Sequence, residues 1–314
     1  MTHQPIPTLI TILGPTASGK TTLAVNLANS LQGEIISADS RQVYQHMDLG
    51  TGKDIEEYGS IPYHLIDIID PQDEYNLFKF TQDFCHSFLD IIERQKQPLL
   101  VGGTGMYLDS VLNRYNLTIA NIDKNTRQDL EKKTEEELSE ILKQIKPLQH
   151  NTTDSFQKER LIRAIEIAVE EDNPSKQIHW PVFNELTIGI KIPRNQLKQR
   201  IGERLKSRFQ LGMIEEVENL INIGVSKERI DNFGLEYRYI LKHITGELNY
   251  NDMFQKLNSA IFKFSKQQEK WFRNIENKGV KIHWLDFEDN INAKALDLAK
   301  QNLSFIESNP TLQF

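Results

Sequence analysis

The sequence predicts an α/β protein built on a parallel sheet, with a helical insertion within the chain. Short apolar runs that suit buried strands alternate with helical patterns, which is typical of parallel sheets. Gly14–Thr21 follows the first of these runs and has the spacing of a phosphate-binding loop. Between residues 116 and 181 glycine disappears, charge rises and no strand pattern remains. We therefore expect a core made of residues 1–115 and 182–314, with a helical insertion domain at 116–181.

The segment Gly14–Thr21 reads GPTASGKT and fits G-x-x-x-x-G-K-[ST] at every fixed position. The apolar run Leu9–Leu13 precedes it, and the helical spacing of Thr21–Leu31 follows it. In such a P-loop the backbone N–H groups face an anion, a lysine adds positive charge, and a hydroxyl is placed for Mg²⁺. The alternative is a glycine-rich turn that binds nothing. The expected phosphate contacts are Gly14, Thr16, Ala17, Ser18, Gly19, Lys20 and Thr21, with Thr21 as the metal ligand.

Two later strands are expected to end beside this loop. Glu34–Ser37 is a short apolar run that leads to Asp39, and Pro98–Val101 leads to the glycine turn Gly102–Tyr107. In an open α/β sheet, ligands bind outside the carboxyl ends of the strands. Asp39 is therefore a candidate catalytic carboxylate, or alternatively the cap of a helix. Thr104 is a candidate contact to a phosphate oxygen, or alternatively part of a tight turn.

The segments between these strands complete the expected sheet. Tyr63–Ile69 is a candidate strand, in which the lone His64 is expected to be structural. Tyr75–Arg94 has aromatic residues at helical spacing, which indicates a helix packed on the core. Met47–Lys53 is rich in turn residues. Neither Pro98–Val101 nor Leu65–Asp67 forms an apolar strand that ends in an aspartate with a catalytic carboxylate alongside, which weakens an NTPase function.

The remaining segments are expected to be helical, apart from two strands at Leu186–Ile192 and Val280–Leu285. Within the insertion, Asn125–Ile145 and Asp154–Glu171 have helical patterns. The apolar side of the second pattern is expected to consist of Phe156, Leu161, Ile165 and Val169. A terminal helix follows the last strand.

Two stretches of the chain are strongly basic. One lies in the long helical pattern Arg194–Leu220, whose inward-packing residues are expected to be Leu197, Ile201, Leu205 and Phe209. Seven basic residues between Ile188 and Phe209 face one acid, Glu203, and five within Lys256–Arg273 face only Glu269. Such stretches in an acidic chain suggest a groove for a polyanion such as nucleic acid. The alternative is an ordinary solvated helix face.

Composition limits the class of protein further. The chain has 314 residues, a net charge of −7 and a single cysteine, Cys85. A single cysteine excludes an intrachain disulfide and a cysteine-based zinc site, which fits a reducing cytosol. The N-terminal apolar run suits a first strand rather than a signal peptide, and no run is long enough to span a bilayer. We expect a cytoplasmic monomer with no membrane association and no obligate protein partner.

These stretches resemble, in the same order, those of bacterial tRNA dimethylallyltransferases. The matching segments are GPTASGKT, ISADSRQVY, MDLGTGK, LVGGTGMYL, RLIRAIEI and the RIGERL…GMIEEV helix, and the resemblance runs from about Leu9 to Asp286. It implies a P-loop kinase-like fold whose helical insertion domain contacts tRNA. It also implies that a dimethylallyl group passes from dimethylallyl pyrophosphate to N6 of adenosine 37, in the tRNA anticodon stem-loop, with Mg²⁺ as cofactor.

The resemblance also implies roles for individual residues. Asp39 would act as general base on the amine, while Lys20 and Thr104 would stabilise the leaving pyrophosphate together with the P-loop. Arg238 would be a further pyrophosphate ligand. The target adenine would have to be flipped out of its stack to reach the pocket. The implied tRNA contacts are Ser40, Gln42, Tyr44, Arg163, Arg200, Arg204, Lys266, Gln268 and Arg273.

The chain departs from the family pattern at four positions. Phe233 and Glu236 stand where the family commonly has an arginine and a glycine, and Phe262 and Gln267 stand in place of two further arginines. These departures suggest a divergent second-copy member. Two alternatives stay open: a prenyltransferase that acts on free adenine nucleotides, and a non-catalytic tRNA-binding paralogue. The segment Gly102–Tyr107 disfavours a small-molecule P-loop kinase.

Overall fold

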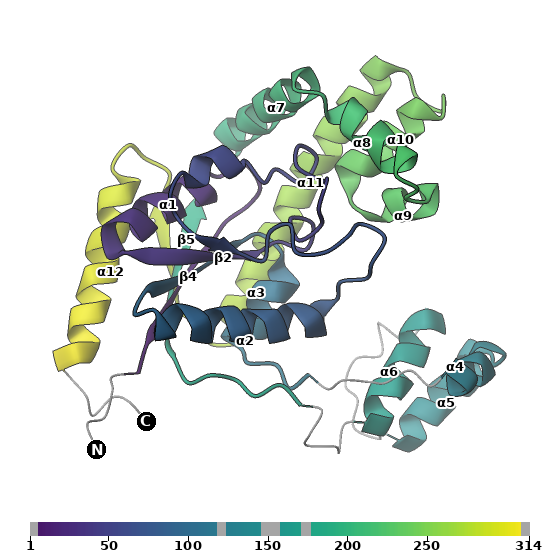
Figure 1. Cartoon of the computed structure of the whole chain (residues 1–314), viewed down its shortest axis with the longest axis horizontal. Coiled ribbons are helices and arrows are strands. Elements are labelled where there is room, and N and C mark those ends of the chain that lie inside the picture. Colours follow the sequence, from purple (N-terminus) through teal and green to yellow (C-terminus); the bar gives the residue numbers. More distant parts are fainter. Residues whose placement is uncertain (1–5, 118–123, 146–157, 171–176, 309–314) are drawn as a thin grey trace. The chain divides into compact units, whose positions relative to one another are not determined.

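The chain divides into a larger unit, Met1–Arg114 with Pro181–Phe314, and a smaller unit, Tyr115–Trp180 (Figure 1). The computed structural model describes residues 6–117, 124–145, 158–170 and 177–308. None of the described helices combines the length and the apolar character that a membrane crossing requires.

A parallel sheet runs through the larger unit. In the described residues it has the strand order β3-β2-β4-β1-β5-β6, so the predicted parallel α/β class is confirmed. Strands β1 and β2 are buried along their whole length, which is typical of strands that are covered on both faces. The strands are β1 (Thr8–Leu13), β2 (Gly33–Ala38), β3 (Tyr63–His64), β4 (Gln97–Gly102), β5 (Asn184–Lys191) and β6 (Ile282–Asp286).

The strand order sets the position of the site. β4 lies between β1 and β2, and its last residue, Gly102, is in register with Leu13 of β1 and Ala38 of β2. The P-loop, the Asp39 turn and the second glycine turn therefore leave three neighbouring strands at the same level. An added Cβ on Gly102 would lie 2.2 Å from the backbone oxygen of Ala38, so only glycine permits this close approach.

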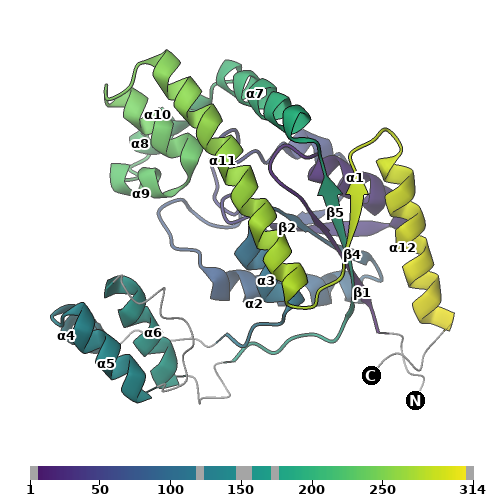
Figure 2. The same cartoon turned by 180° about the vertical axis from the view of Figure 1, so that it is seen from behind.

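Helices cover both faces of the sheet. α1 (Lys20–Leu31) and α12 (Ile291–Ser308) pack on one face (Figure 1). α2 (Leu77–Glu93) and α3 (Gly105–Leu112) lie on the other, with the long helix α11 (Tyr250–Asn277) beside α3 (Figure 2). The predicted core helix at 75–94 is confirmed, because Phe80, Phe84 and Phe88 of α2 are almost completely buried.

A group of helices next to the sheet has its own apolar core. It contains α7 (Arg194–Gln210), α8 (Met213–Asn222), α9 (Lys227–Asn232), α10 (Leu235–Ile244) and part of α11. The single long helix predicted for Arg194–Leu220 is wrong, because the chain breaks between α7 and α8 at Gly212, whose φ is 103°. The inward packing of Leu197, Ile201 and Leu205 is confirmed.

The strand predicted at Tyr63–Ile69 is much shorter than expected. Only Tyr63 and His64 pair with β2, because Leu65 and Asp67 adopt left-handed backbone with φ of 63° and 57°. The Asp67 carboxylate instead pairs with the buried Lys53 ammonium. His64 is structural, as predicted, and its Nε2 lies 2.8 Å from Glu34 Oε2.

The smaller unit contains α4 (Lys124–Glu131), α5 (Glu135–Ile145) and α6 (Lys158–Glu170). These helices bury their own small core, to which Leu161 and Ile165 contribute as predicted. The inward position predicted for Val169 is wrong, since this residue is 66% exposed. Phe156 lies outside the described residues.

Candidate active site

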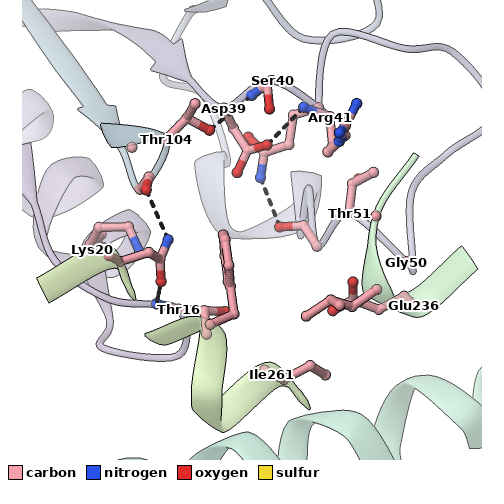
Figure 3. Close-up of a pocket in the computed structure, with 18 of the residues that line it drawn as sticks. Thr16, Lys20, Asp39, Ser40, Arg41, Gly50, Thr51, Thr104, Glu236 and Ile261 are labelled. Atoms are coloured by element: carbon pink, nitrogen blue, oxygen red, sulfur yellow. Dashed lines mark hydrogen bonds between the residues drawn. The ribbon is translucent and has the colours of Figure 1, made fainter. Parts of the chain in front are cut away.

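A pocket of about 380 Å³ opens at the carboxyl ends of β1, β2 and β4. Residues of α7, α10 and α11 line it as well, so segments far apart in the sequence meet there (Figure 3). The predicted site residues in its lining are Thr16, Lys20, Thr21, Asp39, Ser40, Gln42, Thr104, Arg204 and Gln268. The predicted site residues outside its lining are Gly14, Ala17, Ser18, Gly19, Tyr44, Arg163, Arg200, Arg238, Lys266 and Arg273.

The P-loop has the backbone of an anion cradle, with left-handed geometry at Gly19, whose φ is 87°. Two of its amides are already engaged. The Thr16 N–H donates to Gln268 Oε1 at 2.8 Å, and the Ser18 N–H donates to the backbone oxygen of Pro15 at 3.2 Å. The amides of Thr16 and Ser18 are therefore not free for an anion, whereas those at the N-terminus of α1 can bind one.

Lys20 is a half-buried cation at the start of α1. Its Nζ donates to the backbone oxygen of Pro15 at 2.9 Å. Burial, and after it the positive charge of Arg204, lower the pKa of Lys20 to about 8, while Asp39 acts in the opposite direction. A bound anion would favour the charged form, because an opposite charge nearby raises the pKa of an ammonium group. Lys20 is thus placed and tuned as a ligand for an anion.

Asp39 projects into the pocket from the turn after β2 (Figure 3). Its Oδ1 accepts a hydrogen bond from the Arg41 N–H at 2.9 Å. The alternative role as the cap of a helix is wrong, because a turn and not a helix follows this residue. Within the described residues Oδ2 accepts no hydrogen bond. The carboxylate is therefore oriented through one oxygen, while the other can accept a proton from a ligand.

Thr104 joins the turn after β4 to the turn after β2. Its Oγ1 accepts a hydrogen bond from the Ser40 N–H at 3.1 Å, and its own N–H donates to the backbone oxygen of Ala38 at 3.3 Å. The residue precedes α3 but makes no side-chain cap to that helix. Because its hydroxyl acts here as an acceptor, the hydroxyl proton can be donated to a ligand oxygen in the pocket.

Gln268 connects the P-loop to the second glycine turn, which is not the role predicted for it. Its Oε1 accepts from Thr16, and its Nε2 donates to the backbone oxygen of Gly103 at 2.9 Å. The side chain is almost completely buried. The predicted contact with tRNA is therefore wrong for this residue, because both polar groups of the amide are engaged inside the protein. The sequence placed Gln268 in a basic stretch and gave no signal of this inward contact.

Three arginines of α7 also point inward, although the sequence suggested an outer basic surface. Arg200 donates to the backbone oxygen of Ala17 at 2.8 Å, and its guanidinium lies 4.8 Å from the ring centre of Phe287. Arg204 and Arg208 both pair with the carboxylate of Asp54. Arg200 thus supports the P-loop, and its contact with tRNA stays a prediction. Arg204 lines the pocket and is placed to meet an anion there.

The loop after β2, Met47–Lys53, is fixed by charges that the sequence analysis did not single out. One carboxylate of α8, Glu216, accepts the N–H groups of three successive residues, Asp48, Leu49 and Gly50, at 2.7, 2.7 and 2.9 Å. Gly52 has a φ of 68°, and an added Cβ would lie 2.0 Å from Arg208 Nη2. The Gln42 amide donates to the backbone oxygen of Gly52 at 3.0 Å. The sequence feature that could have identified this loop was the pair Gly50 and Gly52, two residues apart in a turn.

The segment at the start of α10 corrects two further predictions. Arg238 does not line the pocket, because its guanidinium pairs with Asp231 at 3.2 Å. Tyr44 is 4% exposed and packs on Phe233, so it is a core residue rather than an RNA contact. Glu236 lines the pocket instead of Arg238, and burial raises the pKa of its carboxyl group against the opposing effect of nearby arginines.

Three of the predicted RNA contacts lie outside the pocket with their charged groups accessible. Lys266 and Arg273 are exposed on α11. The Arg273 guanidinium lies 4.0 Å from the Glu269 carboxylate, which is the limit of an ion pair. Arg163 belongs to the smaller unit, where its guanidinium pairs with Glu166 at 3.0 Å. These residues remain predicted tRNA contacts.

Oxygen donors for a divalent cation are present in the pocket. Thr21 and Asp39 both line it. No group of three or more His, Cys, Asp or Glu side chains that could hold a metal occurs in the described ranges. This donor set fits Mg²⁺, which is commonly bound through one or two protein ligands, waters and the oxygens of a substrate phosphate.

Comparison with known proteins identifies relatives over most of the chain. The family model described as IPP transferase matches residues 42–275, and that described as isopentenyl transferase matches residues 7–58. The tRNA dimethylallyltransferase 1 of Geotalea uraniireducens is 51% identical over 294 residues, which are 94% of this chain and 97% of that protein. The tRNA dimethylallyltransferase 2 of Citrifermentans bemidjiense is 50% identical over 301 residues, 96% of this chain and 98% of its own.

Solved structures give the same grouping. The tRNA isopentenylpyrophosphate transferase of Bacillus halodurans has a TM-score of 0.71 at 30% identity, with 98% of this chain and 99% of that chain covered. A eukaryotic dimethylallyltransferase acting on tRNA has a TM-score of 0.81 at 24% identity and covers 96% of this chain and 80% of its own. The similarity to this eukaryotic enzyme shows that the two chains share a fold.

Proposed function

The chain belongs to the tRNA dimethylallyltransferase family, whose members are prenyltransferases that act on tRNA, and we propose that it transfers a dimethylallyl group from dimethylallyl pyrophosphate to N6 of adenosine 37. The observation that supports this proposal is the meeting of three features in one pocket. They are the P-loop with Lys20, the Asp39 carboxylate, whose Oδ2 accepts no hydrogen bond from the described part of the chain, and the Thr104 hydroxyl. A cytoplasmic location is part of the proposal, because the substrate is tRNA.

The leaving group sits on the P-loop side of the pocket. The N6 nitrogen attacks the first carbon of the dimethylallyl group, and the carbon–oxygen bond to the pyrophosphate breaks with its electron pair on oxygen. The amides at the start of α1, Lys20 and Arg204 stabilise the negative charge that develops there. Thr21 would hold Mg²⁺, which would supply further positive charge beside the pyrophosphate.

Asp39 accepts the proton that the adenine amine loses. An exocyclic adenine amine is a poor nucleophile, and it must lose a proton as its bond to carbon forms. Asp39 Oδ2 accepts this proton, while Oδ1 stays bonded to the Arg41 N–H and keeps the carboxylate oriented. Thr104 donates its hydroxyl proton to an oxygen of the pyrophosphate from the adjoining turn.

The tRNA approaches with its target base flipped out of the anticodon loop, since a stacked adenine cannot enter the pocket. Lys266 and Arg273 contact the RNA backbone from the exposed side of α11. Ser40 and Gln42 lie in the pocket and contact the flipped nucleotide. The helical unit at 115–180, including Arg163, grips the stem-loop.

The test incubates the protein with dimethylallyl pyrophosphate, Mg²⁺ and unmodified tRNA that carries adenosine at position 37, and detects prenyladenosine by mass spectrometry. We expect product on tRNA and none on free AMP. Asp39→Asn should lower kcat by roughly 10²–10⁴-fold, the usual contribution of a general base. The matched control Asp289→Asn, at an exposed site, should leave kcat unchanged.

Other outcomes contradict the proposal. Product on AMP with equal efficiency indicates a prenyltransferase of free nucleotides. Binding of tRNA without product from either substrate indicates a non-catalytic tRNA-binding protein. Full activity of Asp39→Asn removes this residue as the base.

A further inference from the structure

One buried side chain connects two loops on either side of the pocket. Gln268 of α11 accepts the Thr16 N–H through Oε1 at 2.8 Å and donates through Nε2 to the Gly103 oxygen at 2.9 Å. Thr16 lies in the P-loop after β1, whereas Gly103 lies in the turn after β4. Gln268 is 6% exposed, so water does not compete for either bond. The donor and the acceptor of a single amide thus fix the separation of the two loops.

The surrounding residues are built for this close contact. An added Cβ on Gly103 would lie 2.5 Å from Gln268 Nε2, and one on Gly105 would lie 2.5 Å from Trp271 Cβ. Gln268 and Trp271 are three residues apart and therefore share a face of α11. The two glycines let this face approach the turn, and a side chain at either position would push α11 away.

The turn that contains Gly103 is also hydrogen-bonded to the turn that carries the proposed base. Thr104 follows Gly103 in the chain, and its hydroxyl accepts the Ser40 N–H next to Asp39. Gln268 therefore stands between the loop proposed to hold the leaving group and the turn that carries the proposed base. The oxygen and the nitrogen of the amide are thus each engaged by a backbone group inside the protein.

We infer that Gln268 is a positioning residue that sets the distance between the pyrophosphate loop and the wall formed by Asp39 and Thr104. This inference rests on the proposed function. Displacement at carbon requires the nucleophile and the leaving group to be held in line, and a misplacement of about 1 Å can lower the rate about 10²-fold. Each loop would still bind its own substrate without Gln268, so its loss should affect kcat rather than either KM.

The experiment compares Gln268→Met, which keeps the length of the side chain without its hydrogen bonds, with Gln268→Glu. The carboxylate of the second variant can still accept the Thr16 N–H but faces the Gly103 oxygen without a proton. At saturating tRNA and dimethylallyl pyrophosphate, kcat should fall by about 10- to 100-fold in both variants, with both KM values within about threefold of wild type. Gln255→Met, at an exposed site of the same helix, should behave as wild type.

Hydrogen exchange provides a readout that does not depend on activity. The Thr16 amide should exchange faster in Gln268→Met, while the amides in the middle of α11 keep their protection. Loss of protection along the whole helix would instead indicate a general structural role and would overturn the inference.

The kinetic results distinguish the remaining possibilities. A raised KM for tRNA with unchanged kcat would make Gln268 an RNA contact and overturn the inference, as would wild-type kcat in both variants. If the wild-type protein itself forms no prenyladenosine, the proposed function fails. Unchanged Thr16 exchange in Gln268→Met would refute the contact itself.

Discussion

The two basic stretches, α7 and α11, look alike in the sequence and differ in the structure. On α7, Arg200, Arg204 and Arg208 turn towards the protein and bind a backbone oxygen or the Asp54 carboxylate. On α11, Lys266 and Arg273 are exposed. A cluster of basic residues on a helix can therefore either pair with groups inside the protein or remain exposed, and the local sequence does not show which.

The difference has a physical cause. Arg200, Arg204 and Arg208 are four residues apart, so they share one face of α7, next to the buried positions Leu197 and Ile201. Asp54, on a loop about 150 residues earlier in the chain, supplies the carboxylate that makes this inward position favourable. The exposed cations of α11 stay largely solvated, where a mobile partner such as RNA can pair with them. Four predictions test this contrast, in order of expected effect.

The largest effect is expected at Arg204, which lines the pocket beside Lys20. Arg204→Ala should lower kcat/KM for dimethylallyl pyrophosphate by roughly 30- to 150-fold, because a hydrogen bond to a charged group contributes about 2–3 kcal/mol. The KM for tRNA should not change. Steady-state kinetics with each substrate varied in turn measure both effects, with the exposed Lys206→Ala as the control on the same helix. A raised KM for tRNA alone would mean that α7 is an outer RNA surface after all.

Asp54 should matter for stability. Asp54→Asn leaves the buried Arg208 and its neighbour Arg204 without a carboxylate and should lower the free energy of unfolding by roughly 1–3 kcal/mol. This is less than for a fully buried pair, since the Asp54 side chain is 35% exposed. Urea denaturation at pH 7 measures the difference, and Asp289→Asn is the exposed control. Equal stability of Asp54→Asn and wild type would mean that the pairing of Arg204 and Arg208 with Asp54 does not stabilise the fold.

The stability contribution of Asp54 should also depend on pH. Burial alone would raise the pKa of Asp54, but Arg204 and Arg208 outweigh it and lower the pKa below the usual 3.8. A carboxylate with a lowered pKa stabilises the fold above the unfolded pKa and loses this contribution as the pH falls through the folded pKa. The difference in the free energy of unfolding between wild type and Asp54→Asn should therefore be constant above about pH 5 and become smaller below about pH 4.

The smallest effects are expected for single cations of α11. Lys266→Ala and Arg273→Ala should each weaken tRNA binding by about 3- to 10-fold and reduce the salt dependence of binding by about one unit of slope. The affinity for dimethylallyl pyrophosphate should be unchanged. Binding titrations at several salt concentrations measure this, with Lys294→Ala on α12 as the control. An unchanged salt slope in both variants would argue against α11 as the RNA surface.

Much of the site could be predicted because its parts depend on local patterns. The P-loop needs Gly14, Gly19 and Lys20 at fixed spacing after a strand, and the sequence showed all three. Asp39 and Thr104 could be found because each follows a short apolar strand, and parallel strands end at one edge of the sheet. The break at Gly212 was missed because the helical spacing of apolar residues continues across it.

Local sequence patterns predict the parallel α/β class, the anion loop and the two polar turns beside it, because each depends on residues close together in the chain. Long-range packing accounts for the rest: Gln268 and Arg200 hold the P-loop, Arg238 pairs with Asp231, and Tyr44 is buried. These outcomes depend on which distant group offers a partner to a polar side chain. Thr16 meets Gln268 across 252 residues. The periodicity of the sequence does not indicate such a contact, because the contact depends on how the helices pack on the sheet.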